Sequence, residues 1–211
     1  MEVLKVQLAR TIWLFDAQEL NPKGISLFPE VFHAFGKRYQ FGTLPKPEEL
    51  GAGGSLFFKQ GKFVCGPFAV EVDLDLHADG LVASCRHSTE VAHEFLLDCI
   101  GFLGEQLALV YPPHITKKRI YRSEVIVQLE AGLGGLSPRV QEFSAFLSNL
   151  SQKDVQATGI LFGDDGGASP IFTLDRRVNI PWEDNRYFSS SSLPTSQHIE
   201  ALEKLERIMA A

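Results

Sequence analysis

The chain has 211 residues, of which 45% are hydrophobic and 22% are charged. This is the composition of a globular protein and excludes a largely disordered chain, which carries fewer apolar and more charged residues. The formal net charge of −6 disfavours a nucleic-acid partner, because proteins that neutralise phosphates carry a basic stripe. The one basic cluster, Lys117 to Arg122, is expected to be a solvated approach to a strand.

The cysteines and the hydrophobic stretches indicate in which cellular compartment the protein is expected. Cys65, Cys85 and Cys99 are odd in number and show no CxxC spacing, which argues against a disulfide framework. The first ten residues lack the layout of a signal peptide, and no apolar run approaches the roughly 18 residues of a membrane span. We therefore expect a cytoplasmic protein with no membrane segment.

The first strand is predicted between Val3 and Phe15, where the even positions are almost all aliphatic. We expect those positions to face the core, which leaves Trp13 and Phe15 on the outward side. A helix follows in FPEVFHAFGKRY, from Phe28, with a proline in its first turn. The Pro- and Gly-rich stretch from Gly42 to Ser55 is expected to be a connection.

Two hairpins and a long helix are predicted next. SLFFKQGKFVCG has a hairpin pattern around Gly61. PFAVEVDLDLHADGLVASC is expected to turn at Ala78-Asp79-Gly80, because Asp-Gly suits a tight hairpin. Ser88 is a good cap for a helix that extends to about Leu109.

The second half begins with a strand in IYRSEVIVQLEAG and a helix that starts at Ser137-Pro138. VQATGILFGDDGGASPIFTLDRRV predicts two strands around a glycine-rich turn, and NIPWEDNRYFSSSSLP predicts a loop. Thr195 begins the last helix, whose apolar residues are spaced by three and four.

The two halves share short similarities in the same order. Pro29 corresponds to Pro138, Gly54 to Gly159 and Ser88 to Thr195, at spacings of 105 to 109 residues. The sequence predicts a single α+β domain over 1–211, with a curved antiparallel sheet and helices on one face. Halves 1–112 and 113–211 would then be pseudo-twofold copies of a β-α-β-β-β(-β)-α unit. The alternative is an unrepeated α+β domain. This element order resembles the saddle of TATA-binding-protein-like domains, a likeness of architecture alone.

The stretch VEVDLDLHADG, from Val70, alternates apolar residues with Glu71, Asp73, Asp75 and His77. This is the pattern of a half-buried strand, and the EF-hand spacing of glycine and glutamate is absent. On an open sheet face the acidic residues would form a negative strip that receives a basic partner.

Three functions remain open. The first is a non-catalytic protein-interaction or assembly module, expected to be a subunit of a larger cytoplasmic complex or a homo-oligomer, which binds a protein partner through the open sheet face. Its expected contact residues are Trp13, Phe15, Glu71, Asp73 and Asp75.

The second function is a metal-dependent hydrolase that uses Asp164 and Asp165 with Asp73, Asp75 or His77. The third is a small-ligand binder with a cavity lined by Phe. We favour the first, because the sequence has no HExxH, phosphate loop, dinucleotide fingerprint or nucleophile elbow. We expect no cofactor.

Overall fold

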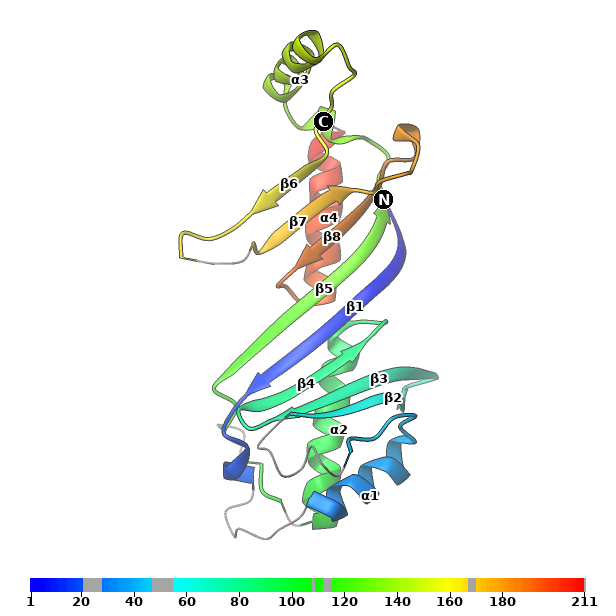
Figure 1. Cartoon of the computed structure of the whole chain (residues 1–211), viewed down its shortest axis with the longest axis vertical. Coiled ribbons are helices and arrows are strands. Elements are labelled where there is room, and N and C mark those ends of the chain that lie inside the picture. The colour runs from blue at the N-terminus through cyan, green and yellow to red at the C-terminus, as the bar shows by residue number, and fades with distance from the viewer. Residues whose placement is uncertain (21–27, 47–54, 108, 112–114, 167–169, 211) are drawn as a thin grey trace. The chain divides into compact units, whose positions relative to one another are not determined.

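The computed structural model describes residues 1–20, 28–46, 55–107, 109–111, 115–166 and 170–210. It confirms the α+β class: eight strands form an antiparallel sheet in the order β2-β3-β4-β1-β5-β8-β7-β6 (Figure 1). The strands are β1 (Glu2–Leu14), β2 (Leu56–Cys65), β3 (Phe68–His77), β4 (Gly80–Cys85), β5 (Lys118–Gln128), β6 (Gly159–Phe162), β7 (Phe172–Arg176) and β8 (Arg186–Ser191). The helices are α1 (Phe28–Tyr39), α2 (Thr89–Leu107), α3 (Pro138–Ser151) and α4 (Thr195–Met209), with 3-10 turns η1 (Ala17–Leu20), η3 (Leu133–Leu136) and η4 (Trp182–Asp184).

The chain divides into two compact units. The central unit consists of Leu8–Arg122, and the terminal unit of Met1–Gln7 and Ser123–Ala211. No described helix is both long enough and apolar enough to cross a membrane. The predicted connection from Gly42 to Ser55 lies largely outside the described residues.

In the central unit, α1 and α2 pack on the same face of the sheet. Phe95 of α2 is fully buried, and Phe35 of α1 lies between Phe58 of β2 and Phe102 of α2, with ring centroids 5.7 and 6.2 Å away. Asp98 joins the two helices by accepting hydrogen bonds from Arg38 and Tyr39. Aromatic packing and the partly exposed ion pair between Arg38 and Asp98 therefore hold α1 and α2 together.

The hydrogen bonds to Asp98 also set its ionisation. Burial opposes the charged carboxylate, but the bonds from Arg38 (2.6 Å) and Tyr39 (2.6 Å) outweigh burial and lower the pKa of Asp98. Burial raises the pKa of Tyr39 far above its usual range, so the phenol stays a donor.

The orientation predicted for β1 was wrong. Trp13 is fully buried and Phe15 is 2% exposed, so from Ala9 onward the odd positions face the helices. Trp13 lies opposite Leu81 of β4 and stacks on Tyr111, with ring centroids 5.6 Å apart. The inward side also carries Ala9 and Thr11, which are small or polar, whereas the opposite side carries aliphatic residues. The strand is thus apolar on both sides, and alternation alone selects the wrong one.

The hairpin predicted around Gly61 was also wrong, because β2 runs as one strand beside β3. The pairing register shifts between Phe58 and Gly61, and Gln60 takes a left-handed φ of 58°. A Cβ on Gly61 would lie 2.4 Å from the ring of Phe41, so only glycine fits. The sequence signal for a turn is therefore a β-bulge. The predicted turn between β3 and β4 is confirmed.

In the terminal unit, α4 covers one face of the strands with Leu202 and Met209, which pack on Val125, Val127 and other core residues. The loop predicted over the serine run was wrong, since Arg186–Ser191 is strand β8. Its inward residues are Tyr187, Ser189 and Ser191, all buried. Buried serines carry no apolar periodicity, which is why the strand escapes sequence analysis.

A buried chain of hydrogen bonds fixes the serines of this unit. Ser189 donates its hydroxyl proton to the carbonyl of Thr173 (2.6 Å), so its Oγ accepts from Nε2–H of His198 (2.8 Å). Nδ1 of His198 then accepts the hydroxyl proton of Ser123 (3.0 Å). His198 is fully buried, and burial lowers its pKa to about 4, so the imidazole is neutral.

Candidate protein interface

The sequence-predicted acidic strip lies on the sheet face opposite α1 and α2, but its charges are largely engaged within the unit. The Lys59 ammonium lies 2.7 Å from Asp75 and 3.6 Å from Asp73. Asp73 also accepts a hydrogen bond from the backbone N–H of Gln60 (2.8 Å). Glu71 is exposed. Binding through this strip stays a prediction, whereas the expected exposure of Trp13 and Phe15 was wrong.

The groups considered for metal chemistry show no ligand set. Among the described residues, no three His, Cys, Asp or Glu side chains come together in a way that could hold a metal ion. Asp164 and Asp165 are exposed after β6, and His77 bonds to Ser55 through Nδ1. Glu94 accepts a hydrogen bond from Cys65 instead of joining His87 or His93.

The most unusual feature of the terminal unit is α3, a helix of 14 residues with no buried side chain. Ser137 caps it by accepting from the N–H of Arg139, and Pro138 begins it, as the sequence predicts. Figure 1 shows α3 near the start of β6, beyond the strand ends, whereas α4 lies along the strands. The expectation that every helix covers the sheet is therefore wrong for α3.

The polar side of α3 faces its own chain. Gln141 donates through Nε2 to the carbonyl of Gly134 in η3 (2.8 Å), and Ser148 accepts through Oγ from the N–H of Val155 (2.9 Å). Gln141 and Ser148 are seven residues apart, so they lie on one side of the helix. These contacts hold α3 on η3 and on the segment before β6, although no side chain of the helix is fully buried.

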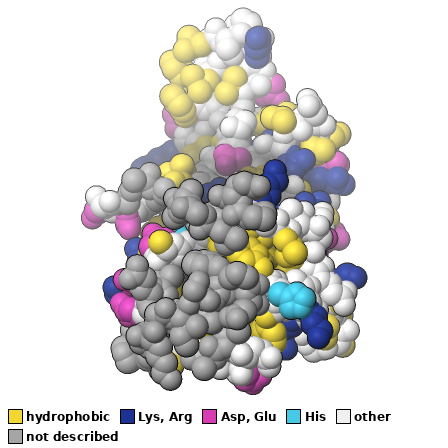
Figure 2. Space-filling view, turned by 60° about the horizontal axis from the view of Figure 1, so that its bottom comes forward, with side chains coloured by type: hydrophobic (Ala, Val, Ile, Leu, Met, Phe, Trp, Pro, Cys, Tyr) yellow, Lys and Arg dark blue, Asp and Glu magenta, His cyan; other side chains and the backbone are white. Residues whose placement is uncertain are grey.

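The opposite side of α3 is apolar and open. Phe143 is 60% exposed, Phe146 54% and Leu150 68%, and the two Phe rings stack with centroids 6.4 Å apart. Figure 2 shows hydrophobic side chains gathered on this helix. A surface helix normally turns its apolar stripe to the core and its polar stripe to solvent. In α3 the apolar stripe stays largely exposed to solvent, and no side chain of the helix is buried.

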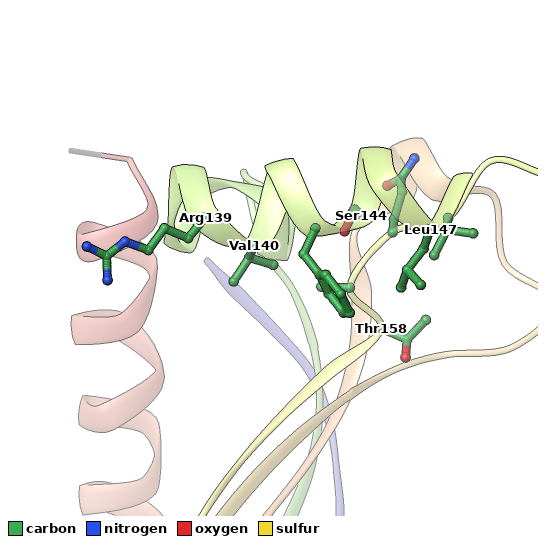
Figure 3. A pocket seen from close by; sticks show the side chains of 9 residues that line it. Arg139, Val140, Ser144, Leu147 and Thr158 are labelled. Atoms are coloured by element: carbon green, nitrogen blue, oxygen red, sulfur yellow. The ribbon is translucent and has the colours of Figure 1, made fainter. Parts of the chain in front are cut away.

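A groove of about 490 Å³ runs between α3 and the segment Val155–Thr158. Figure 3 shows Leu147 of α3 above Thr158, with Val140 and Arg139 toward the other end of the helix. The groove is lined mainly by apolar side chains, which also include those of Phe143, Val155 and Ala157. Such a lining suits an apolar or extended peptide segment better than a charged small molecule.

Beyond Thr158 the chain enters β6, the last strand at its end of the sheet. Leu161 is 68% exposed and Phe162 is 58% exposed, whereas Ile160 packs against the core. An edge strand with exposed apolar residues is a template for pairing with another chain. We call the exposed apolar residues of α3 and β6 the α3–β6 surface: Val140, Phe143, Phe146, Leu150, Leu161 and Phe162.

Comparison with models of known protein families and with curated protein sequences finds no match to this chain. Its functional interpretation therefore rests on the geometry of the described residues. Sequence analysis located the start of α3 but missed the α3–β6 surface. One signal in the sequence could have indicated it. The same helix carries a second, polar stripe, Gln141, Ser144 and Ser148, whose side chains can hydrogen-bond to the rest of the protein.

Proposed function

We propose that the chain is a non-catalytic protein-interaction module, a subunit of a larger assembly, which binds its partner through the α3–β6 surface. The observation that carries this proposal is the exposed apolar stripe of α3: the helix hydrogen-bonds its polar side to its own chain and leaves Phe143, Phe146 and Leu150 more than half exposed. Isolated helices of this length are marginal in water, because most helix stability comes from packing of an apolar face. A partner that covers the stripe supplies the missing packing.

The central unit supports the proposal by contrast. Phe32, Phe35 and Tyr39 of α1 have the same three-four spacing as Phe143, Phe146 and Leu150 of α3. In α1 the stripe packs on the sheet and on α2, and Phe35 and Tyr39 are 1% and 2% exposed. An equivalent stripe on α3 has no cover among the described residues, so we assign its cover to another molecule.

We also infer that the chain arose by duplication of a β-α-β-β-β-α unit. The order β1-α1-β2-β3-β4-α2 recurs as β5-α3-β6-β7-β8-α4, and the strand order 2-3-4-1 recurs in reverse as 5-8-7-6. On this interpretation α3 is the duplicate of α1, and its apolar stripe binds a partner instead of packing on the sheet. The three free cysteines support a reducing compartment, and we propose the cytoplasm.

Site-specific photocrosslinking in the native cell tests the proposed function. A benzophenone-bearing amino acid at Phe146 is expected to capture a protein, because this side chain is at the centre of the exposed stripe. The matched control is Val178, which is 82% exposed in the same unit but lies outside the α3–β6 surface. We expect a discrete, protein-sized adduct from Phe146 and at most traces from Val178. Equal yields from the two positions would contradict the proposal.

A further inference from the structure

We propose that the partner on the α3–β6 surface is a second copy of this chain, paired antiparallel through the free edge of β6. This inference rests on the proposed function and names its partner. The pairing is isologous, with the same residues contributed by each copy about a twofold axis.

The hydrogen bonds of β6 define which backbone groups are free. The carbonyl of Thr158 accepts from the N–H of Arg176 (2.7 Å), and the carbonyl of Phe162 accepts from the N–H of Ile171 (2.8 Å). Both carbonyls therefore point toward β7. In an antiparallel ladder successive residues alternate in direction, so the N–H and C=O of Leu161 point to the open edge. Leu161 can exchange both bonds with a new strand.

Side-chain direction then selects the register. Residues directly opposite in an antiparallel pair lie on the same face of a sheet, so a core-facing residue must meet a core-facing residue. Placing Leu161 on the twofold axis opposite its own copy satisfies this condition. It also brings Ile160 opposite Phe162 of the second copy, and it covers Phe162, which is 58% exposed.

The charges at the two ends of β6 are complementary in this register. Asp164 and Asp165 follow the strand and are exposed. Exposed Arg177 follows Arg176, the residue bonded to Thr158. Antiparallel pairing puts Asp164 of one copy opposite Thr158 of the other, at the end of the strand where Arg177 lies. A parallel arrangement would bring like charges together.

The exposed apolar area is sufficient for a dimer. Taking about 200 Å² for a fully exposed large side chain, the α3–β6 surface exposes roughly 700 Å² per copy. Stable interfaces bury about 800 Å² per partner, including a polar rim. The surface thus supplies most of one side of a standard interface.

Mass measurement by light scattering over a concentration series tests the pairing. The native chain is expected to reach twice the chain mass. Leu161→Pro removes the outward N–H and leaves the bonds between β6 and β7 in place, because proline is tolerated at the open edge of a strand. We expect it to weaken dimerisation at least about tenfold. Leu161→Val, which keeps the N–H, should lose far less. Equal dimerisation by both variants would overturn the strand pairing.

A charge exchange provides a test that misfolding cannot imitate. Asp164→Lys with Asp165→Lys, and separately Arg177→Glu, should each dimerise poorly alone. Mixing the two variants restores opposite charges at both ends of the seam, so a heterodimer should form. Failure of the mixture to recover association, with both variants folded by circular dichroism, would overturn the proposed register.

The photocrosslinking result distinguishes this inference from the proposed function. An adduct from Phe146 with twice the chain mass supports both. An adduct with a different protein, together with a monomeric purified chain, overturns the homodimer and leaves the interaction module standing. Absence of any adduct beyond the Val178 level overturns both.

Discussion

At the residue scale, the hydrogen-bond chain from Ser123 through His198 and Ser189 to Thr173 ties three strands to α4. The donor and acceptor roles in this chain predict that substitutions of Ser189 and Ser123 lower the free energy of unfolding by different amounts. Ser189→Ala removes the bond to the Thr173 carbonyl and leaves the Nε2–H of His198 without its partner, whereas Ser123→Ala removes only the bond to Nδ1. The Thr173 carbonyl keeps its place in the ladder opposite Ser190, so Ser189→Ala loses two hydrogen bonds and Ser123→Ala loses one. With about 0.5–1.5 kcal/mol for each hydrogen bond, Ser189→Ala should lower the free energy of unfolding more. Urea unfolding of the two variants measures the difference, and equal losses would contradict the assigned tautomer.

The same histidine predicts a pH dependence. Burial lowers the pKa of His198 to about 4 from an unfolded value of 6.5, so the unfolded chain binds more protons between these limits. Stability should therefore fall as pH drops from 6.5 to about 4, by on the order of 3 kcal/mol. His93, whose pKa burial also lowers, adds to the slope.

The control for the pH dependence is His198→Gln, which cannot titrate. Urea unfolding at several pH values should give a shallower decline for this variant than for the native chain. A decline of the same steepness would show that His198 does not carry the effect.

At the element scale, α1 and α3 predict opposite responses to the loss of aromatic side chains. Phe35→Ala in α1 should cost about 3–5 kcal/mol, because it opens a cavity in a packed core. Phe146→Ala in α3 should change the free energy of unfolding of the diluted chain by no more than about 0.5 kcal/mol, because the side chain is 54% exposed. Chemical unfolding at low protein concentration checks this contrast, and a large loss from Phe146→Ala would mean that α3 packs on its own unit.

Elements with strong periodicity could be predicted from the sequence, and those with competing signals could not. The Ser137-Pro138 start and the Asp79-Gly80 turn follow from local chemistry, and both are confirmed. The inward side of β1 depends on a tertiary contact of Trp13 with Tyr111, which alternation cannot reveal. Strand β8 uses serines inside the core, where hydrogen bonds to carbonyls replace apolar contacts.

The same reasoning explains why the candidate site was only half predictable. The spacing of Phe143, Phe146 and Leu150 identifies an apolar stripe, and an apolar stripe is usually buried. Its exposure depends on Gln141 and Ser148, whose partners Gly134 and Val155 are known only from the fold. The acidic strip on β3 was correctly assigned to a strand face, but Lys59 beside it depends on the bulge in β2.

At the scale of the whole molecule, the central claim is that another protein covers the exposed apolar stripe of α3. Hydrogen exchange measures this cover directly, by comparing the chain in its native assembly with the same chain diluted to the monomer. We predict that amides of Pro138–Ser151 exchange markedly more slowly in the assembly, while amides of α4 exchange alike in both samples. Equal exchange of α3 in the two samples would contradict the claim.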